Sequence, residues 1–412
     1  PVKRFDEPLR KQVMSDQPSL PTGFSAAGIH CGVKSDPSVF DLCLFVSDRA
    51  ASLAGVFTQN KVCGAPVKLS RQRVPRATGR AVVINSGNAN ACTGERGDAD
   101  AAWMPEQTAA SLGCDAEDVV VCSTGIIGHF LPRAVLESGI PAAASQLAST
   151  PEAFNAASCG MMTTDTFAKL TTRTIDIGRT TIRVSAVAKG AAMIGPNMAT
   201  MLGVVMTDAA LTPEDTDAML RHSVNRSFNC ISVEGHTSTS DTVFLFANGA
   251  AVHADLNDES RAALQDAIDQ VTMEMAQAII RDAEGADHFV TIDVEGARTR
   301  DEAHCIAKAI ADGALVKTAI TGADPNWGRI VSAAGYSGIE MAEEEISLQI
   351  NDVLIYESGA PTEYDEAALS QSMRDNRDVS IKLLLSHGEA SVRFWTSDLT
   401  AEYVRLNSEY TT

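Results

Sequence analysis

Residues 189–202 read KGAAMIGPNMATML and join two β-rich runs of the chain. The glycines and the Pro-Asn pair in this stretch disfavour regular structure as far as the Ala199–Thr200 bond. An apolar run, MLGVVM, occupies residues 201–206 directly after Thr200 and predicts a strand. Taken alone, the pattern predicts a buried loop that crosses from one strand to the next.

The sequence on either side alternates short β-rich runs with amphipathic helices, which predicts the α+β class with layered sheets flanked by helices. A domain boundary is expected where the longest helix ends near Gly285. It would divide the chain into a larger domain, 1–287, and a smaller C-terminal α+β domain, 288–412. The expected strands are 42–47, 53–58, 66–70, 81–85, 119–123, 169–174, 181–187, 201–206, 241–248, 288–294, 314–320, 346–350 and 379–384. The expected helices are 98–112, 211–223, 258–282, 302–311, 327–334 and 365–374.

The charge balance argues against two classes of partner. The 412 residues carry 33 Lys and Arg against 53 Asp and Glu, a formal net charge of −20. Nucleic acids and anionic lipid surfaces are bound through clustered Lys and Arg, and the sequence has no such cluster. The longest weakly polar stretch, 191–206, is too short to span a membrane and is interrupted by Pro196. We therefore expect neither nucleic acid nor membrane as a partner.

The nine cysteines are scattered through apolar stretches, and none lies in a CxxC pair. Their number is odd, which does not suit a disulfide framework. We interpret them as reduced core thiols, which favours a reducing, cytoplasmic location and gives no zinc site.

Standard catalytic and nucleotide-binding motifs are missing from the sequence. It contains no GxxxxGK[ST], no GxGxxG after a strand, no GxSxG and no HExxH. The eight histidines are isolated from one another, and His129 is best interpreted as a polar loop residue. The sequence therefore predicts no metal and no organic cofactor, and it leaves any nucleophile without a conventional side-chain base.

Three loops have unusual compositions. Residues 85–94 contain three Asn and two Gly directly after an apolar run, so a tight turn and a catalytic loop are both open interpretations. Ser123-Thr124-Gly125 ends another apolar run, where a hydroxyl and a backbone N–H can be aimed at one point. Residues 322–329 predict a structural turn that leads into a helix.

Together, these segments resemble the ornithine acetyltransferase (glutamate N-acetyltransferase) family of arginine biosynthesis. The match runs essentially end to end, and its motifs occur in the family's order. It implies a layered fold of the N-terminal-nucleophile type, in which the chain cuts itself between Ala199 and Thr200 into pieces 1–199 and 200–412. The matching segments are Phe24–Gly28, Val56–Thr58, Asn85–Gly94, Ser123–Gly128, Thr163–Thr166, Pro196–Leu202, Gly322–Arg329 and Asn407–Thr412.

Such a cut would supply the missing base. A threonine hydroxyl is a poor nucleophile by itself, and an amide nitrogen is not a base. A free α-amine has a reference pKa of roughly 7.7–8.0, so that of Thr200 would be suited to deprotonating its own hydroxyl near neutral pH.

The resemblance also implies roles for individual residues. Thr200 would be the nucleophile, and the Thr124 hydroxyl with the Gly125 N–H would form the oxyanion hole. Lys189 would suit a substrate carboxylate and Glu284 an ammonium. From the residues alone, an exposed cation, a solvated acid and a frayed tail are ordinary interpretations of Lys189, Glu284 and the C-terminal positions. The implied substrate contacts are Thr166, Lys189, Thr200, Glu284, Asn407 and Thr412.

The chain departs from the family pattern beside these contacts, which leaves the acceptor amino acid open. The departures are Ala168, Ala191, Ala192, Glu234, His236 and Asp287.

The implied reaction is a ping-pong transfer of acetyl from N2-acetyl-ornithine to glutamate, and some relatives also accept acetyl-CoA as donor. The family's cleaved halves stay together and pair into heterotetramers. Two alternatives stay open. One is an amidase or aminopeptidase of the same fold, in which water removes the acyl group. The other is an uncleaved, non-catalytic paralogue that binds an amino acid or a protein.

Overall fold

The computed structural model describes residues 17–177, 180–195, 201–251 and 256–409. Its larger sheet has the strand order β4-β3-β2-β9-β7-β6-β5, and β1 pairs with β2 at the side. The strands are β1 (Phe24–Ile29), β2 (Leu42–Phe57), β3 (Arg76–Asn88), β4 (Val119–Ile126), β5 (Lys169–Ile177), β6 (Thr180–Lys189), β7 (Leu202–Thr207) and β9 (Thr242–Ala247).

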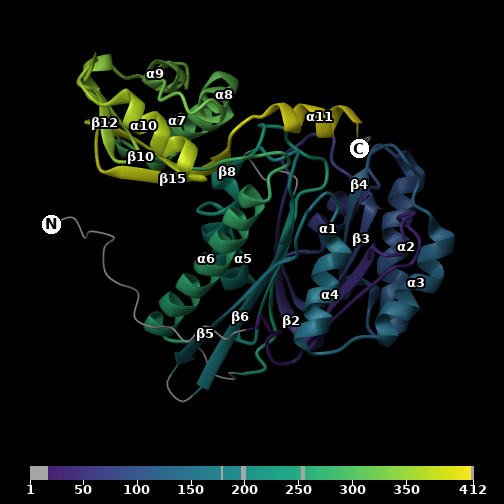
Figure 1. Ribbon diagram of the computed structural model, residues 1–412. Coiled ribbons are helices and arrows are strands. Elements are labelled where there is room, and N and C mark those ends of the chain that lie inside the picture. The colour runs from purple at the N-terminus through teal and green to yellow at the C-terminus, as the bar shows by residue number, and fades with distance from the viewer. Residues whose placement is uncertain (1–16, 178–179, 196–200, 252–255, 410–412) are drawn as a thin grey trace.

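This sheet folds over at β2, so that its two halves stack face to face. Phe45 from one half and Phe244 from the other belong to one buried apolar cluster. Because successive side chains of a strand alternate between faces, Leu44 and Leu245 point outward from the same strands. Leu44 packs in a cluster with helices α2 and α3, and Leu245 in a cluster with α5 and α6. The result is four layers, helix–sheet–sheet–helix (Figure 1).

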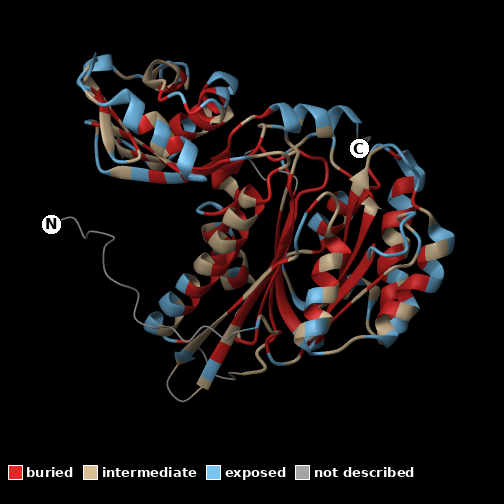
Figure 2. Ribbon diagram, in the orientation of Figure 1, coloured by how far each residue is buried: buried red, intermediate tan, exposed pale blue. Residues whose placement is uncertain are grey.

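Helices α1, α2 and α3 cover the outer face of one half-sheet and α5 and α6 that of the other, whereas α4 packs on the apolar cluster between the halves; each helix is buried along the side that faces the sheet (Figure 2). Helix α5, expected at 211–223, begins at Pro213, because Thr212 caps it by accepting a hydrogen bond from the Asp215 N–H at 3.1 Å. The helices are α1 (Ala65–Arg73), α2 (Gly94–Leu112), α3 (Arg133–Ser145), α4 (Pro151–Met161), α5 (Pro213–Val224) and α6 (Asp258–Arg281). Short 3-10 turns are η1 (Ala116–Asp118) and η2 (Phe228–Cys230).

A second sheet, of order β13-β12-β11-β14-β10-β15-β8, carries most of the C-terminal part. Helix α11 (Ala401–Glu409) then returns along the edge of the large sheet (Figure 1). The strands are β8 (Ile231–Ser232), β10 (Phe289–Ala297), β11 (Ile346–Ile350), β12 (Val353–Glu357), β13 (Ala360–Pro361), β14 (Asp378–Leu385) and β15 (Ala390–Ser397). The helices are α7 (Arg300–Asp312), α8 (Ala314–Thr321), α9 (Trp327–Gly335) and α10 (Glu366–Asp375), with a 3-10 turn η3 (Glu343–Glu345).

The predicted α+β class and its layered arrangement are confirmed, whereas two expected strands are helices. Residues 66–70 lie in α1, where Val67, Ser70 and Arg73 are buried at a helical spacing of three. Residues 314–320 form most of α8, whose buried residues again recur every three or four positions. The runs 42–47 and 53–58 belong to one long strand, β2. The division at 287/288 stays a proposal: β8 lies before it in sequence and pairs with β15 after it.

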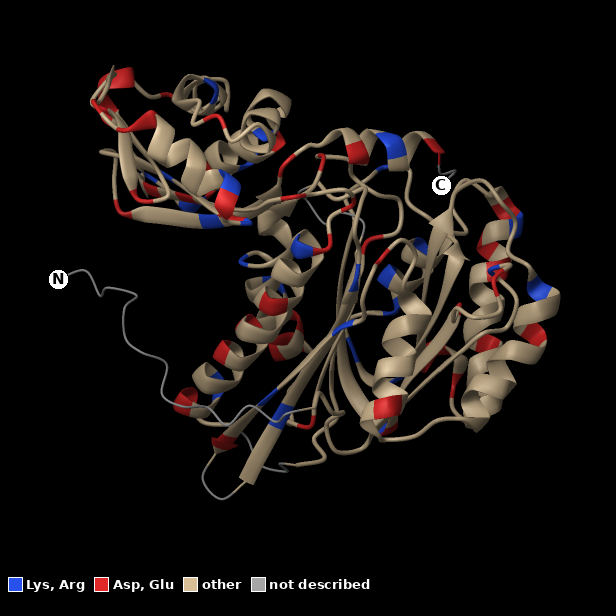
Figure 3. Cartoon of the chain, viewed as in Figure 1, with Lys and Arg blue, Asp and Glu red and all other residues tan. Residues whose placement is uncertain are grey.

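Acidic side chains are spread over the outer helices and the second sheet, with basic ones among them (Figure 3). Among the described residues, no helix is both long and apolar enough to cross a membrane. All nine cysteines are free thiols. Cys43, Cys122 and Cys230 are buried as expected, but Cys92 and Cys305 are exposed rather than in the core.

Candidate active site

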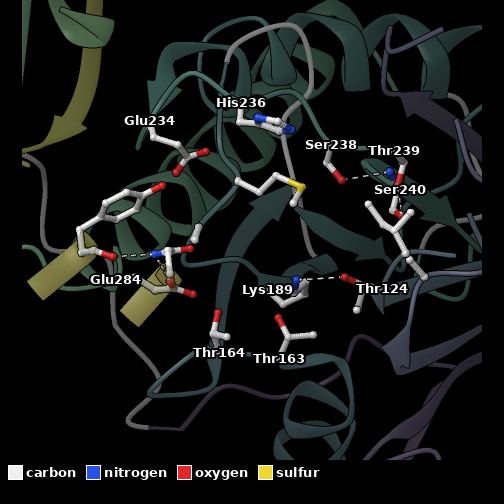
Figure 4. Close-up of a pocket in the computed structure, with 17 residues that line it drawn as sticks. Thr124, Thr163, Thr164, Lys189, Glu234, His236, Ser238, Thr239, Ser240 and Glu284 are labelled. Carbon is white, nitrogen blue, oxygen red and sulfur yellow. Dashed lines mark hydrogen bonds between the residues drawn. The ribbon is translucent and has the colours of Figure 1, made fainter. Parts of the chain in front are cut away.

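A cavity of about 240 Å³ opens where the two halves of the large sheet meet at one end (Figure 4). Its walls come from the ends of β4 and β6, the loop before β9, the turn after α6, and α11. Five of the residues predicted for the site line it: Thr124, Gly125, Lys189, Glu284 and Asn407. The other lining residues are Ala89, Ile127, Thr163, Thr164, Ala192, Met193, Glu234, His236, Ser238, Thr239, Ser240 and Tyr403.

Thr124 and Lys189 form a hydrogen-bonded pair at this cavity. Lys189 Nζ donates to Thr124 Oγ1 over 3.1 Å, and both residues are buried. A lysine ammonium is only a donor, so the Thr124 hydroxyl keeps its own proton available to donate elsewhere. The structure therefore provides a hydroxyl donor at the end of β4, fixed by a buried cation.

Gly125 lies next to this hydroxyl in a conformation that requires glycine. Its φ is +128°, and a Cβ there would stand 2.4 Å from the carbonyl carbon of Gly87 on β3. The Asn-rich segment 85–94 begins within β3 and continues past its end, and its side chains hold the backbone: Asn85 Nδ2 donates to the Asn88 carbonyl at 2.9 Å. Asn88 Nδ2 in turn donates to the His129 carbonyl at 3.2 Å. The turn interpretation of residues 85–94 fits these contacts, and only Ala89 of that loop lines the cavity.

Lys189 is a buried cation in a mixed electrostatic environment. Burial lowers the pKa of its ammonium below the ordinary value, and the carboxylates of Asp165 and Asp241 act against this. The positive charge of Lys169 also lowers the pKa, and Glu284 raises it. Lys189 is therefore a buried positive group that a substrate carboxylate would stabilise further.

Lys169 anchors the floor of the site through a fully buried ion-pair network. Its Nζ lies 2.6 Å from Asp165 Oδ1 and 2.5 Å from Asp282 Oδ2. Asp165 Oδ1 also accepts the Gly190 N–H at 2.7 Å, while Asp282 Oδ2 accepts the Thr166 N–H at 3.0 Å. The network thus joins the end of β6 to the turn after α6.

Thr166 lies apart from the other predicted residues. Its hydroxyl donates to Asp282 Oδ1, and its side chain faces a second, adjoining cavity of about 650 Å³. Thr164 and Glu284 line both cavities, so the two spaces are neighbours.

Glu284 and Asn407 close one side of the smaller cavity. The Glu284 N–H donates to the Ala191 carbonyl at 3.0 Å, and Asn407 Nδ2 donates to Glu284 Oε2 at 3.0 Å. Helix α11 approaches so closely that a Cβ on Gly285 (φ +64°) would lie 2.5 Å from the backbone nitrogen of Tyr403. The C-terminal helix is therefore a wall of the site.

The residues that follow the predicted cut, Met201 and Leu202, lie beside the Lys189 wall of the cavity. In the register of β6 and β7, Leu202 lies opposite Lys189. The Met201 N–H donates to Asp241 Oδ1 at 3.0 Å. Burial raises the pKa of the Asp241 carboxyl well above its ordinary value, although the Met201 N–H and Lys189 act against this. The predicted residues Ala199, Thr200 and Thr412 lie outside the described residues.

Sequence reasoning missed part of the cavity wall. Glu234 and His236 were expected only as departures from the family pattern, and Ser238–Ser240, in the same segment, were not predicted to line the site. The available signal was the run of Ser and Thr directly before the strand expected at 241–248, which repeats the small-hydroxyl pattern of 123–125. In the part of the chain that the structure describes, no group of three or more His, Cys, Asp or Glu is placed to hold a metal ion.

Sequence comparisons with known proteins cover almost the whole chain. The model of the ArgJ family matches residues 25–412. The "Arginine biosynthesis bifunctional protein ArgJ" of Rhodopirellula baltica is 46% identical over 396 residues, which cover 95% of this chain and 96% of that protein. The protein of the same name from Geobacter sulfurreducens is 41% identical, covering 95% and 99%. A crystal structure of the protein of the same name from Bacillus halodurans is 37% identical, with a TM-score of 0.49. The match covers 50% of this chain and 98% of the chain in that structure. The chain belongs to the ArgJ family.

Proposed function

We propose that this enzyme of arginine biosynthesis transfers acetyl from N2-acetyl-L-ornithine to L-glutamate through an acetyl ester on Thr200, formed after the chain cuts itself at Ala199–Thr200. Its membership of the ArgJ family supports the pathway. The acyl-transfer chemistry is supported most directly by the buried Lys189–Thr124 hydrogen bond, which lies opposite the start of β7.

The proposed cut and the proposed transfer are the same type of reaction. In the cut, the Thr200 hydroxyl attacks the Ala199 carbonyl carbon, the C–N bond breaks, and water then hydrolyses the resulting ester. In the transfer, the freed amine accepts the hydroxyl proton while the oxygen attacks the acetyl carbon. The C–N bond to ornithine breaks, and ornithine leaves with the proton. Glutamate's amine then attacks the ester and releases Thr200.

Both steps build negative charge on a carbonyl oxygen. Thr124 and Gly125, adjacent residues that line the cavity, would stabilise this charge through the Thr124 hydroxyl and the Gly125 N–H. Loss of one such donor typically raises a barrier by about 2.7–4 kcal/mol.

The cavity also offers complementary charges for an amino acid. Lys189 would bind the α-carboxylate. Glu284, held by Asn407, would accept a hydrogen bond from the substrate's α-nitrogen, which is an amide N–H in N2-acetyl-ornithine and the amino group in glutamate. Thr166 and Thr412 are retained as proposed substrate contacts. Thr166 would act from the adjoining cavity.

The decisive experiment is mass spectrometry of the purified protein before and after incubation with N2-acetyl-ornithine. We expect two pieces, the second beginning Thr-Met-Leu-Gly and gaining the mass of one acetyl group. Glutamate should then accelerate ornithine release, and acetyl-CoA in place of N2-acetyl-ornithine tests the second donor.

Other outcomes favour the alternatives. Ornithine release that glutamate does not accelerate would identify an amidase. A single full-length species without acetyl would identify a non-catalytic paralogue.

We also propose that pieces 1–199 and 200–412 stay associated, form a heterotetramer and work in the cytoplasm. The interleaving of their strands in the large sheet supports the association.

A further inference from the structure

Glu234 presents to the cavity a buried carboxyl group that has no side-chain partner among the described residues. It lies on the loop between β8 and β9 and lines the same space as Lys189 and Thr124 (Figure 4). Both of its carboxyl oxygens are buried, and no side chain among the described residues pairs with them; the polar groups that face them are backbone N–H groups of Met193, Ile194 and His236. A buried carboxyl that no cation and no side-chain donor pairs with is unfavourable, so a polar group that enters the cavity is its natural partner.

The loop that carries Glu234 is held in place by Asp312, the last residue of helix α7. Ser232 Oγ donates to Asp312 Oδ1 at 2.5 Å, and a Cβ on Gly235 (φ +78°) would stand 3.2 Å from Asp312 Cγ. The Glu234 N–H donates to the Ile194 carbonyl at 3.3 Å. These contacts hold the side chain at the cavity wall.

The charges around Glu234 leave both of its protonation states accessible. Burial raises the pKa of its carboxyl to about 7, while the backbone N–H groups of Ile194 and His236 and the charge of Lys317 on α8 act against this. Burial, with the charges of Glu234 and Glu284, raises the pKa of Tyr403 on α11 to about 12, so that hydroxyl stays neutral.

The imidazole of His236, on the same loop, also lines the cavity, and the other charged groups on this side have partners. Asp312 is paired with Lys308 at 2.6 Å. Lys189, on the wall formed by β6, donates to Thr124. Glu284 is also engaged, because its Oε2 accepts from Asn407. Among these groups, Glu234 is the one whose carboxyl has no side-chain partner within the described residues.

The two substrates of the proposed reaction differ in charge at the end of the side chain. Ornithine ends in an ammonium and glutamate in a carboxylate, yet a ping-pong enzyme receives both in one site. We propose, building on the function proposed above, that Glu234 binds the side-chain end of both substrates. As a carboxylate it accepts a hydrogen bond from the δ-ammonium of ornithine, and as a carboxylic acid it donates one to the γ-carboxylate of glutamate. A proton is therefore released to solvent when ornithine binds and taken up when glutamate binds.

Isothermal titration calorimetry tests this without turnover, because ornithine and glutamate do not react when no acetyl donor is present. The wild-type protein is titrated at neutral pH in two buffers of different ionisation enthalpy. We expect proton release with L-ornithine and uptake with L-glutamate. L-norvaline, which is ornithine without its terminal amino group, should give neither. Raising the pH through 7 should tighten ornithine binding and weaken glutamate binding.

Two matched variants locate the effect. Glu234→Gln mimics the protonated acid, so ornithine should bind about tenfold or more weakly, whereas glutamate and norvaline should bind nearly as in the wild type. Both buffer effects should disappear. Glu363→Gln, at an exposed surface position, should leave all three affinities and both buffer effects unchanged.

The results separate this inference from the proposed function. If the wild type forms acetyl-Thr200 but shows no opposite proton exchange, or if Glu234→Gln weakens both amino acids equally, the role of Glu234 is overturned alone. If the wild type neither becomes acetylated nor binds ornithine, the proposed function fails and this inference fails with it. The wild-type titration needs no variant, so a Glu234→Gln protein that does not fold leaves the test intact.

Discussion

Lys189 on β6 donates a hydrogen bond to Thr124 on β4, and these two strands belong to opposite halves of the folded sheet. The bond joins the two halves at the cavity, where every other predicted contact that the structure describes, apart from Thr166, also lies. Because both residues line the cavity, a substitution of either should lower the rate of acetyl transfer more than the stability of the fold.

Thr124→Val removes the hydroxyl but keeps the shape of the side chain. We expect kcat for acetyl transfer to fall about 10²–10³-fold, because an oxyanion donor is lost. Self-cleavage should slow as well, since the same donor is proposed for it. Steady-state assays and a cleavage time course on denaturing gels measure both. Thr108→Val is the control: that buried hydroxyl donates to the Met104 carbonyl of its own helix, so its loss should leave kcat unchanged.

Lys189→Met removes the buried cation that is proposed to bind the α-carboxylate of the substrate. A hydrogen bond to a charged group contributes about 1.5–3 kcal/mol, so KM for both amino-acid substrates should rise roughly 10- to 150-fold. Lys382→Met, at a partly exposed position on β14 near Glu295, provides the control. Unchanged KM values in Lys189→Met would remove this residue from the substrate site.

Thr200→Ala should leave the chain whole and inactive, because both the attacking oxygen and the freed base are lost. Thr200→Ser keeps an oxygen nucleophile and should still cut to some degree. Intact-mass measurement reads the cleavage, and an ornithine-release assay reads the activity. Acetyl transfer by an uncut Thr200→Ala protein would contradict the proposed mechanism.

Lys169→Met should destabilise the fold by about 3–5 kcal/mol, because it leaves the carboxyl groups of Asp165 and Asp282 buried without their cation. Urea unfolding at fixed protein concentration measures the loss. Replacing both aspartates with Asn in the Lys169→Met protein should recover much of it. If the single variant is as stable as the wild type, the network does not anchor the site.

Acid should weaken the same network. Although burial raises the pKa of Asp165, Lys169 and Lys189 outweigh it and hold the value below the ordinary one. Because the folded pKa is lower than the unfolded one, the contribution of Asp165 to stability is fully present above about pH 4 and is lost as pH falls through the folded pKa. Unfolding free energy measured between pH 6 and pH 3 should decline more steeply in the wild type than in Lys169→Met.

The fold was predictable wherever local signals are strong. The helix expected at 258–282 is observed at Asp258–Arg281, because it is long and Asn257 caps it by accepting the Ser260 N–H at 2.8 Å. Short apolar runs carry no such signal. Residues 66–70 and 314–320 each suit a strand or a buried helix, and only their packing decides. The folding of the sheet at β2 depends on contacts between strands that are distant in sequence, so no local sequence pattern predicts it.

The site was predictable in part, through resemblance to a family. Thr124, Lys189 and Asn407 are far apart in sequence, and no spacing rule brings them together. The Lys169 network was missed because Lys169 and Asp282 are separated by 113 residues. Glu234 was not predicted to line the cavity because nothing in its sequence neighbours shows that its oxygens are buried.

Strands β9 and β7, from the proposed second piece, lie between β2 and β6, from the first. If the bond before Thr200 is broken, the precursor will have folded as one molecule, but the product could refold only when two separate chains meet. Its recovery from denaturant should then depend on protein concentration, whereas that of an uncut variant should not. The cleaved enzyme would then stay folded because it unfolds slowly and not because it refolds easily. This follows from folding before the chain is cut.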